Sequence, residues 1–334
     1  MTFVSRNCLK RATEPANDEV PIPNFFLVGA PRSGTTSIWS YLARHPDVFM
    51  AYQKEPLYFG SDLTKFPHEF AVLEKDRYLA LFRNGGRQRI RGESSVIYLF
   101  SQTAAREIYE FNPAARILIM LRNPVDVIYS HFGQLRWGGY EDLTDFGEAL
   151  AAEEDRRRGR RVPKSTMVVE ALYYRAIGLF GQQVERYLRV FPREQIKIIM
   201  YDEFVQDPEA NYFAILDFLG IARLAPRSYQ IKNLHKEPRN IRISAWLNRP
   251  PAALRPVLRL IPQPYRYHLL GTLGLLLNTR YRARPPLDPA IRRQLIEFYA
   301  DDISKLAKLI DRDLASWLAD ADGSRARSAR PQAP

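Results

Sequence analysis

The residues best suited to chemistry form one short segment near the N-terminus. It reads Gly29-Ala30-Pro31-Arg32-Ser33-Gly34-Thr35-Thr36, and it joins an apolar run, Phe25–Val28, to a stretch with helical spacing, Thr35–Arg44. A turn between a buried strand and a helix directs several backbone N–H groups at one point, and the positive end of the helix adds to them. Arg32 contributes a cation, and the two threonines contribute hydroxyl donors. The segment therefore predicts a binding loop for a phosphate or sulfate group.

This loop differs from a Walker A loop in the place of its basic residue. In GxxxxGK[ST], a lysine follows the second glycine. Here Thr35 holds that position, and the basic residue, Arg32, lies before Gly34. The loop therefore lends little support to a site for a γ-phosphate with Mg²⁺.

A second pair of anion-binding side chains follows another apolar run. Arg122 comes directly after Arg116–Leu121, and Ser130 stands two helical turns further on. Arginine offers a planar fork to phosphate, and serine offers a hydroxyl donor. Taken singly, each residue is more often structural, because an arginine after a strand often forms a surface ion pair and a helix serine often bonds to its own backbone. Because ligands of open α/β sheets lie at the carboxyl ends of strands, the loop and this pair together predict anion sites after two strands of one sheet. A nucleotide phosphorylated at both its 5′ and 3′ ends would need this arrangement.

Strand and helix patterns alternate along the chain, which predicts an α/β fold with a central parallel sheet flanked by helices. The expected strands are 24–29, 116–121 and 196–200, and the expected helices are 35–44, one beginning at 125, 172–190, 208–219 and 288–318. The strands are nearly continuous apolar runs, as in parallel strands covered on both faces. Two segments, about 133–168 and 233–286, match no regular element and are interpreted as lids or acceptor-binding segments.

Composition limits the classes of partner and cofactor. The chain has 334 residues, 46% of them hydrophobic, which suits one large domain, predicted at 23–320 between flexible tails at 1–22 and 321–334. The net charge of +12 favours anionic partners, although an arginine-rich solvated surface would carry the same charge. The single cysteine, Cys8, excludes an internal disulfide, and the five histidines lack a metal-binding spacing. No metal site is predicted.

The sequence lacks the patterns of a secretory signal and of a membrane span. Met1–Asn24 has no apolar run of the kind that a signal needs. The longest apolar stretch, Leu269–Leu277, is far shorter than the roughly 20 residues of a spanning helix. The expected location is therefore cytoplasmic, with peripheral membrane contact left open. No nucleic-acid partner is expected, and the sequence does not indicate an oligomeric state.

These motifs resemble those of sulfotransferases that use 3′-phosphoadenosine 5′-phosphosulfate. Phe26–Trp39 is similar to the 5′-phosphosulfate loop of that family, and Arg122 with Ser130 is similar to its 3′-phosphate motif. The resemblance continues through Phe191–Ile196, Tyr201–Phe204 and Asp207-Pro208 to Phe218-Leu219-Gly220, and it is to glycan, heparan-sulfate-type and bacterial members rather than to cytosolic phenol sulfotransferases. It implies a three-layer sandwich like that of P-loop NTPases. It also implies sulfuryl transfer to a hydroxyl or amine of a carbohydrate, lipid or other small-molecule acceptor, with adenosine 3′,5′-bisphosphate as product and no metal.

The resemblance also implies roles for individual residues. The donor would contact Pro31, Arg32, Ser33, Gly34, Thr35, Thr36 and Ser37 in the loop, Arg122 and Ser130 at the 3′-phosphate, Tyr201 near the adenine, and Arg282 and Arg284, with Arg280 beside them, in a basic loop near the C-terminus. Lys54-Glu55-Pro56-Leu57-Tyr58-Phe59 resembles the segment that carries the glutamate base of glycan sulfotransferases. Glu55 is therefore the predicted base, with Lys54 to orient or neutralise it and Glu93 as its alternative or partner. Arg32 would stabilise the leaving phosphate, although the family often has lysine at that position.

Two other classes of protein match part of the sequence. A P-loop nucleotide kinase would use the loop, but it needs a Walker lysine and usually a carboxylate for Mg²⁺ at a strand end, where this chain has Arg122. A non-catalytic polyanion-binding module would use the basic run Arg156–Arg161. That module leaves the loop and the pair formed by Arg122 and Ser130 without a role.

Overall fold

A computed structural model describes residues 21–65, 72–226, 228–229, 236–240, 278–281 and 284–319, with isolated positions between 243 and 276. The strands are β1 (Phe25–Gly29), β2 (Val48–Met50), β3 (Ile90–Ser94), β4 (Arg116–Leu121), β5 (Ile196–Met200), β6 (Lys236–Pro238) and β7 (Thr279–Tyr281). The helices are α1 (Thr35–Leu42), α2 (Lys75–Ala80), α3 (Ala104–Phe111), α4 (Pro124–Trp137), α5 (Phe146–Ala151), α6 (Glu153–Arg157), α7 (Tyr174–Ile177), α8 (Phe180–Val190), α9 (Tyr201–Gln206), α10 (Pro208–Leu219) and α14 (Pro289–Ile310).

Strands β1 to β5 form one parallel sheet in the order β2-β3-β1-β4-β5, and β6 pairs with β7 in antiparallel fashion. β1 lies at the centre, with Leu27 opposite Ser94 of β3 on one side and Leu118 of β4 on the other. Because the strands are parallel, their carboxyl ends meet at the same edge of the sheet. The segments that follow β1, β3, β4 and β5 are therefore neighbours.

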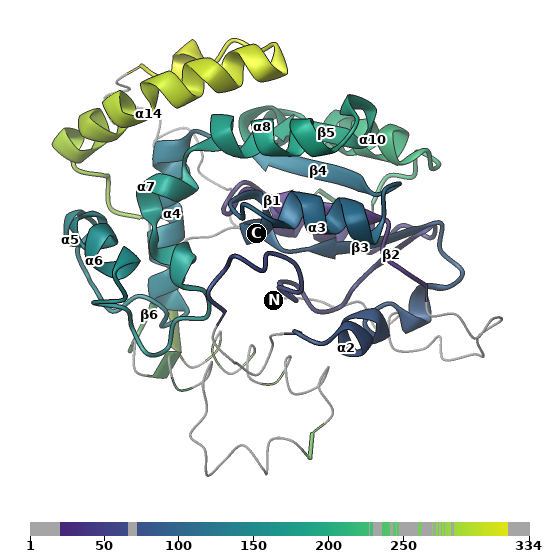
Figure 1. Cartoon of the computed structure of the whole chain (residues 1–334), viewed down its shortest axis with the longest axis horizontal. Helices are drawn as coiled ribbons and strands as arrows, with labels where there is room; N and C mark the ends of the chain where they lie inside the picture. The colour runs from purple at the N-terminus through teal and green to yellow at the C-terminus, as the bar shows by residue number, and fades with distance from the viewer. Residues whose placement is uncertain are drawn as a thin grey trace.

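Both faces of the sheet are covered by helices, as Figure 1 shows. Side chains of β1 alternate between two cores, with Phe26 and Val28 in one and Phe25 and Leu27 in the other. The first core also contains residues of α3, α4, α8 and α14, and the second contains residues of α1, α9 and α10. This alternation confirms the predicted α/β fold with three layers, since a strand buried on both faces needs apolar residues at every position.

Two strands of the sheet, β2 and β3, were absent from the sequence-based prediction. β2 has three residues, which is too few for a periodic signal. β3 reads Ile-Arg-Gly-Glu-Ser, so it lacks the apolar run that marks β1 and β4. Pairing with β1 and β2 makes this polar sequence a strand, which is a tertiary effect.

Two predicted helices end or break earlier than the sequence indicated. The helix expected at 172–190 is interrupted between α7 and α8, where a Cβ on Gly178 would lie 2.4 Å from the hydroxyl of Tyr299. That hydroxyl instead donates to the carbonyl of Arg175 at 3.0 Å, because α14 packs here. α14 itself ends at Ile310 rather than 318, since Asp311 adopts a left-handed conformation with φ of 51°.

The segments predicted to be irregular are partly helical. The stretch 133–168 contains the last turn of α4 and the whole of α5 and α6. The predicted tails and most of 233–286 fall outside the described residues. Among the described helices, each is too short or too polar to cross a bilayer.

Candidate functional site

The loop after β1 is shaped by two residues with positive φ. Arg32 has φ of 60° and Gly34 has φ of 86°. A Cβ on Gly34 would lie 3.2 Å from the Tyr201 ring and 3.3 Å from the Met120 side chain, so only glycine is free of strain here. Helix α1 begins at Thr35 without a side-chain cap. Ser37 N donates to the carbonyl of Gly34 at 3.0 Å, but no backbone bond is described for the N–H groups of Thr35 and Thr36, which suits an anion at the positive end of the helix.

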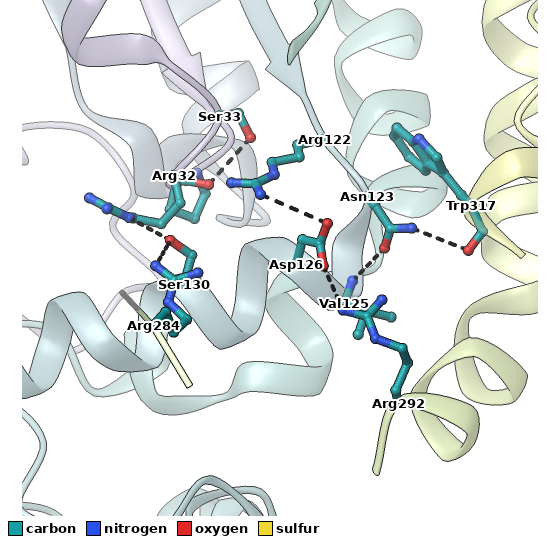
Figure 2. Close-up of polar contacts among 11 residues, drawn as sticks. Arg32, Ser33, Arg122, Asn123, Val125, Asp126, Ser130, Arg284, Arg292 and Trp317 are labelled. Carbon is teal, nitrogen blue, oxygen red and sulfur yellow. Dashed lines mark hydrogen bonds and ion pairs between the residues drawn. The ribbon is translucent and has the colours of Figure 1, made fainter. Parts of the chain in front are cut away.

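Arg32 crosses from this loop to helix α4, where its guanidinium group contacts two side chains, and Figure 2 shows the contact with Ser130. Its Nε donates to the Ser130 hydroxyl at 2.9 Å, and its Nη1 donates to the Gln134 amide oxygen at 3.0 Å. Arg284, from the far end of the chain, also donates to Ser130, with 2.8 Å between its Nη2 and the hydroxyl oxygen. The Ser130 hydroxyl therefore accepts hydrogen bonds from two guanidinium groups.

The positive charge of these arginines is unfavourable in the absence of a bound anion. Burial together with the neighbouring Arg284 and Arg122 lowers the pKa of Arg32 to about 10. Burial, and then Arg122, also lowers the pKa of Arg284. A buried cation normally has a carboxylate partner, yet the bonds described for Arg32 go to a hydroxyl and an amide. The arrangement is the one expected of an anion-binding site.

Arg122 is held beside the cluster by the turn between β4 and α4. Asn123 caps the helix by accepting from Val125 N at 3.0 Å, and its amide donates to the carbonyl of Trp317 at 3.2 Å. The guanidinium of Arg122 lies 4.7 Å from the centre of the Tyr201 ring and 3.8 Å from the carboxylate of Asp126. The cation–π contact leaves its donor edge available to a ligand.

The Lys54–Phe59 segment lies against both the loop and the end of β3. Lys54 Nζ donates to the Thr36 hydroxyl at 3.0 Å. Glu55 N donates to the carbonyl of Ser94, and its Oε2 accepts from Val96 N, each at 2.9 Å. Glu55 also has a positive φ, 57°, as does Leu57. Strained backbone of this kind is typical of functional sites, and it occurs in both segments that the sequence singled out.

Glu55 is half-buried and lies next to Lys54. Burial raises the pKa of its carboxyl above the usual range, although Lys54 and the Val96 amide oppose this effect. Burial lowers the pKa of Lys54, and nearby Arg32 lowers it further. A carboxylate with a raised pKa is a stronger base, which suits proton abstraction.

Glu93 lies deeper, in β3, with none of its surface exposed. The Tyr78 hydroxyl donates to its Oε2 at 2.5 Å. Burial raises its pKa to about 7. Tyr78 and Tyr98 belong to the apolar core on this face of the sheet, so the geometry favours Glu93 as a partner of Glu55 over a role facing the acceptor.

Tyr201, the C-terminal arginines and the histidine that follows Ser130 on α4 lie in different surroundings. Tyr201 lies against Gly34 and Arg122, and its assignment to the adenine stays a prediction. Of the C-terminal arginines, Arg284 reaches the site, Arg280 is exposed on β7, and Arg282 lies outside the described residues. His131 is packed rather than catalytic in position: its Nε2 lies 3.0 Å from the carbonyl of Ala171, and burial lowers its pKa to about 4.

The basic run at 156–161 is engaged within the fold. Arg156 is fully buried and pairs with Glu141 at 2.8 Å. Arg157, Arg158 and Arg160 pair with Glu153, Glu154 and Asp155. Because its charges are largely balanced by these carboxylates, the run gives little support to a polyanion-binding module.

Three site residues were missed from the sequence: Gln134, Asp126 and Arg292. Gln134 stands four residues after Ser130 on α4, and Asp126 stands four residues after Arg122. That spacing, which places side chains on one helix face, was the available signal. Asp126 also pairs with Arg292 of α14 at 2.9 Å (Figure 2). The spacing of residues in the sequence does not indicate this last contact.

The chain is similar in sequence to known sulfotransferases. A family model described as the sulfotransferase family matches residues 23–225. Mouse heparan sulfate glucosamine 3-O-sulfotransferase 6 is 29% identical over 206 residues, which is 60% of this chain and 53% of the relative. Human heparan sulfate glucosamine 3-O-sulfotransferase 3B1 is 23% identical over 282 residues, 83% of this chain and 60% of the relative. The chain thus spans about half to three fifths of the length of these curated relatives.

A solved structure is similar over its whole length. The crystal structure of a sulfotransferase from Alicyclobacillus acidocaldarius has a TM-score of 0.67 and 31% sequence identity. The match covers 90% of this chain and 100% of that one.

Proposed function

The chain belongs to the sulfotransferase family, and we propose that it transfers the sulfuryl group of 3′-phosphoadenosine 5′-phosphosulfate to a hydroxyl or amine of a carbohydrate acceptor. One observation carries this proposal. Arg32 from the end of β1 and Arg284 from the C-terminal part of the chain both donate to Ser130, and Arg122 from the end of β4 lies close enough to lower the pKa of each. Their mutual repulsion is relieved by a ligand with several negative charges.

The two ends of the donor would occupy neighbouring strand ends. The 5′-phosphosulfate would lie in the loop, against Arg32 and the first turn of α1. The 3′-phosphate would lie between Arg122, Ser130 and Arg284, in place of the bonds that Ser130 now accepts. β1 and β4 are adjacent in the sheet, so one nucleotide can reach both places.

The reaction would be an in-line displacement at sulfur. Glu55 takes the proton of the acceptor hydroxyl as its oxygen bonds to sulfur, and the bond from sulfur to the phosphate oxygen breaks. The charge left on that phosphate is stabilised by Arg32 and the loop amides. Because such transition states are loose, positioning and charge stabilisation supply most of the rate enhancement.

A glycan acceptor is supported by the relatives, two of which are named for sulfation of heparan sulfate glucosamine. The net charge of +12 also suits an acidic glycan. A small-molecule or lipid acceptor is the alternative. Incubating the protein with the donor and a panel of glycans, lipids and phenols, and then searching by mass spectrometry for products heavier by one SO₃ group, separates these classes. Cytoplasmic location stays a prediction.

Calorimetry tests the donor. We expect tight binding of adenosine 3′,5′-bisphosphate without Mg²⁺, and much weaker binding of ATP and of heparin. A preference for ATP with Mg²⁺ would favour a kinase, and salt-sensitive binding of heparin alone would favour a polyanion-binding module.

The double variant Arg122→Ala with Ser130→Ala tests the 3′-phosphate assignment. It should bind adenosine 3′,5′-bisphosphate no better than adenosine 5′-phosphate, because both groups that distinguish them are gone. If the variant still prefers the 3′-phosphorylated nucleotide, the 3′-phosphate lies elsewhere.

A further inference from the structure

Residues 238–287 carry most of the excess positive charge of the chain. This segment contains nine arginines and no lysine, aspartate or glutamate, so it supplies nine of the twelve net positive charges. It is also rich in leucine and contains a tryptophan and several tyrosines. Clustered arginines with apolar side chains are typical of segments that bind a membrane surface or a polyanion. The side chains that the structure describes distinguish between these partners.

The described part of this segment presents apolar side chains to its surroundings. Trp246 is 44% exposed and Leu276 is 68% exposed, and the exposed residues of the segment also include Ile243 and Leu269. Ile243 and Trp246 are helical and stand three residues apart, and Leu269 and Leu276 are helical and stand seven apart. Each pair therefore lies on one helix face. A helix of a folded protein normally directs such a face toward the core.

Polar residues of the same two helical stretches are buried instead. Ser244 and Asn278 are both helical and almost fully buried. The amide of Asn278 donates to the Ser244 hydroxyl at 2.7 Å and to the carbonyl of Asn240 at 2.9 Å. The two stretches thus contact each other through polar groups, while their leucines and tryptophan are exposed. This is the reverse of the usual arrangement in water, and an apolar environment would stabilise the exposed faces.

The segment is attached to the folded domain at both of its ends. β6 and β7, which pair with each other, lie on either side of the helical stretches. The indole N–H of Trp137 on α4 donates to the Thr279 hydroxyl of β7 at 2.9 Å. The hydroxyl of Tyr129, also on α4, donates to the carbonyl of Pro285 at 3.0 Å. A partner that binds the exposed faces would therefore hold the whole protein.

We propose that Ile243, Trp246, Leu269 and Leu276 dock on the surface of an anionic lipid bilayer. The apolar side chains would enter the interface, and the arginines of residues 238–287 supply the attraction to its negative charge. An acidic glycan would balance the arginines but leave the apolar side chains in water. A second copy of the chain would cover the apolar side chains but bring two positive segments together. The inference holds whichever nucleotide the donor site binds.

Co-sedimentation of the full chain with vesicles tests the proposal. We expect binding to mixed vesicles of phosphatidylcholine and phosphatidylglycerol, and binding at least about tenfold weaker to phosphatidylcholine alone, because several arginines contribute to the attraction. Trp246→Gln with Leu276→Gln should weaken binding to the mixed vesicles about tenfold or more, because two apolar side chains leave the interface. The matched control is Leu73→Gln with Leu224→Gln, which changes exposed leucines outside the segment and should leave binding unchanged.

The fluorescence of Trp246 gives a second, local readout. Trp246 is exposed, whereas the other three tryptophans of the chain are half-buried or buried: Trp39, Trp137 and Trp317. Its emission should shift to shorter wavelength when the mixed vesicles are added, because the indole leaves water. Trp246→Phe should lose this shift and still bind the vesicles, since phenylalanine keeps an apolar ring.

Absence of binding to the mixed vesicles would overturn the proposal. So would equal binding by the wild type and Trp246→Gln with Leu276→Gln at matched thermal stability, because charge alone would then account for the binding. Light scattering without vesicles tests the second copy. A dimer that the same two substitutions dissociate would assign these faces to self-association and would also overturn the proposal.

Discussion

Replacing Glu55 by glutamine removes the proposed base with little disturbance of the structure. Glutamine retains an oxygen for the bond from Val96 N at 2.9 Å. The bond from Glu55 N to the carbonyl of Ser94 belongs to the backbone and is unaffected. The residue's volume is also kept. What is lost is the capacity to accept a proton.

We expect Glu55→Gln to lower turnover by about 10²-fold or more, which is the usual contribution of a general base. This corresponds to about 2.7 kcal/mol in the activation free energy. Affinity for adenosine 3′,5′-bisphosphate should be kept, since Glu55 makes no described bond to the arginine cluster. The free energy of unfolding should not fall at neutral pH. Burial raises the pKa of Glu55, so its ionised form is destabilising above the unfolded pKa, and an uncharged residue avoids this effect.

The assay is turnover with labelled donor across a range of pH. The wild type should lose activity as pH falls through the raised pKa of Glu55, because the base must be ionised, and Glu55→Gln should lack this acidic limb. Glu93→Gln is the matched control, since glutamine can still accept from the Tyr78 hydroxyl. Normal turnover in Glu55→Gln, with loss in Glu93→Gln, would refute the reasoning and move the base to Glu93.

Three further predictions concern charge. Arg32→Ala should lower turnover by about 10²-fold or more, and near-normal turnover would contradict its role. The thermal unfolding temperature should not fall, because the variant removes a buried cation whose pKa is lowered to about 10. Asp126→Asn removes a partly exposed ion pair that positions Arg122. It should weaken bisphosphate binding about two- to fivefold by calorimetry, with turnover at saturating donor unchanged; an unaltered affinity would show that Asp126 does not position Arg122. Glu141→Gln leaves Arg156 as a buried, uncompensated charge and should lower the free energy of unfolding by about 3–5 kcal/mol in urea titrations; a change below 1 kcal/mol would mean that Arg156 finds another partner.

The sequence determined the parts of this protein that depend on local pattern. The apolar runs at 25–29, 116–121 and 196–200 predicted three strands, and the glycine and proline positions around them predicted the loop after β1 and the start of α4. The residue types in that loop, and the spacing of Arg122 and Ser130, predicted an anion site because backbone amides and guanidinium groups recognise anions wherever they are placed together. These features are short-range, so the order of residues contains them.

The tertiary structure decided which of the many arginines gather. Ser130 receives Arg32 from 98 residues away and Arg284 from 154 residues away, and no periodicity relates such positions. Because the sequence does not indicate long-range contacts, it predicted neither the burial and pairing of Arg156 nor the strand β3. Burial and long-range pairing depend on how the helices pack on the sheet, and packing is settled by all the contacts of the fold together.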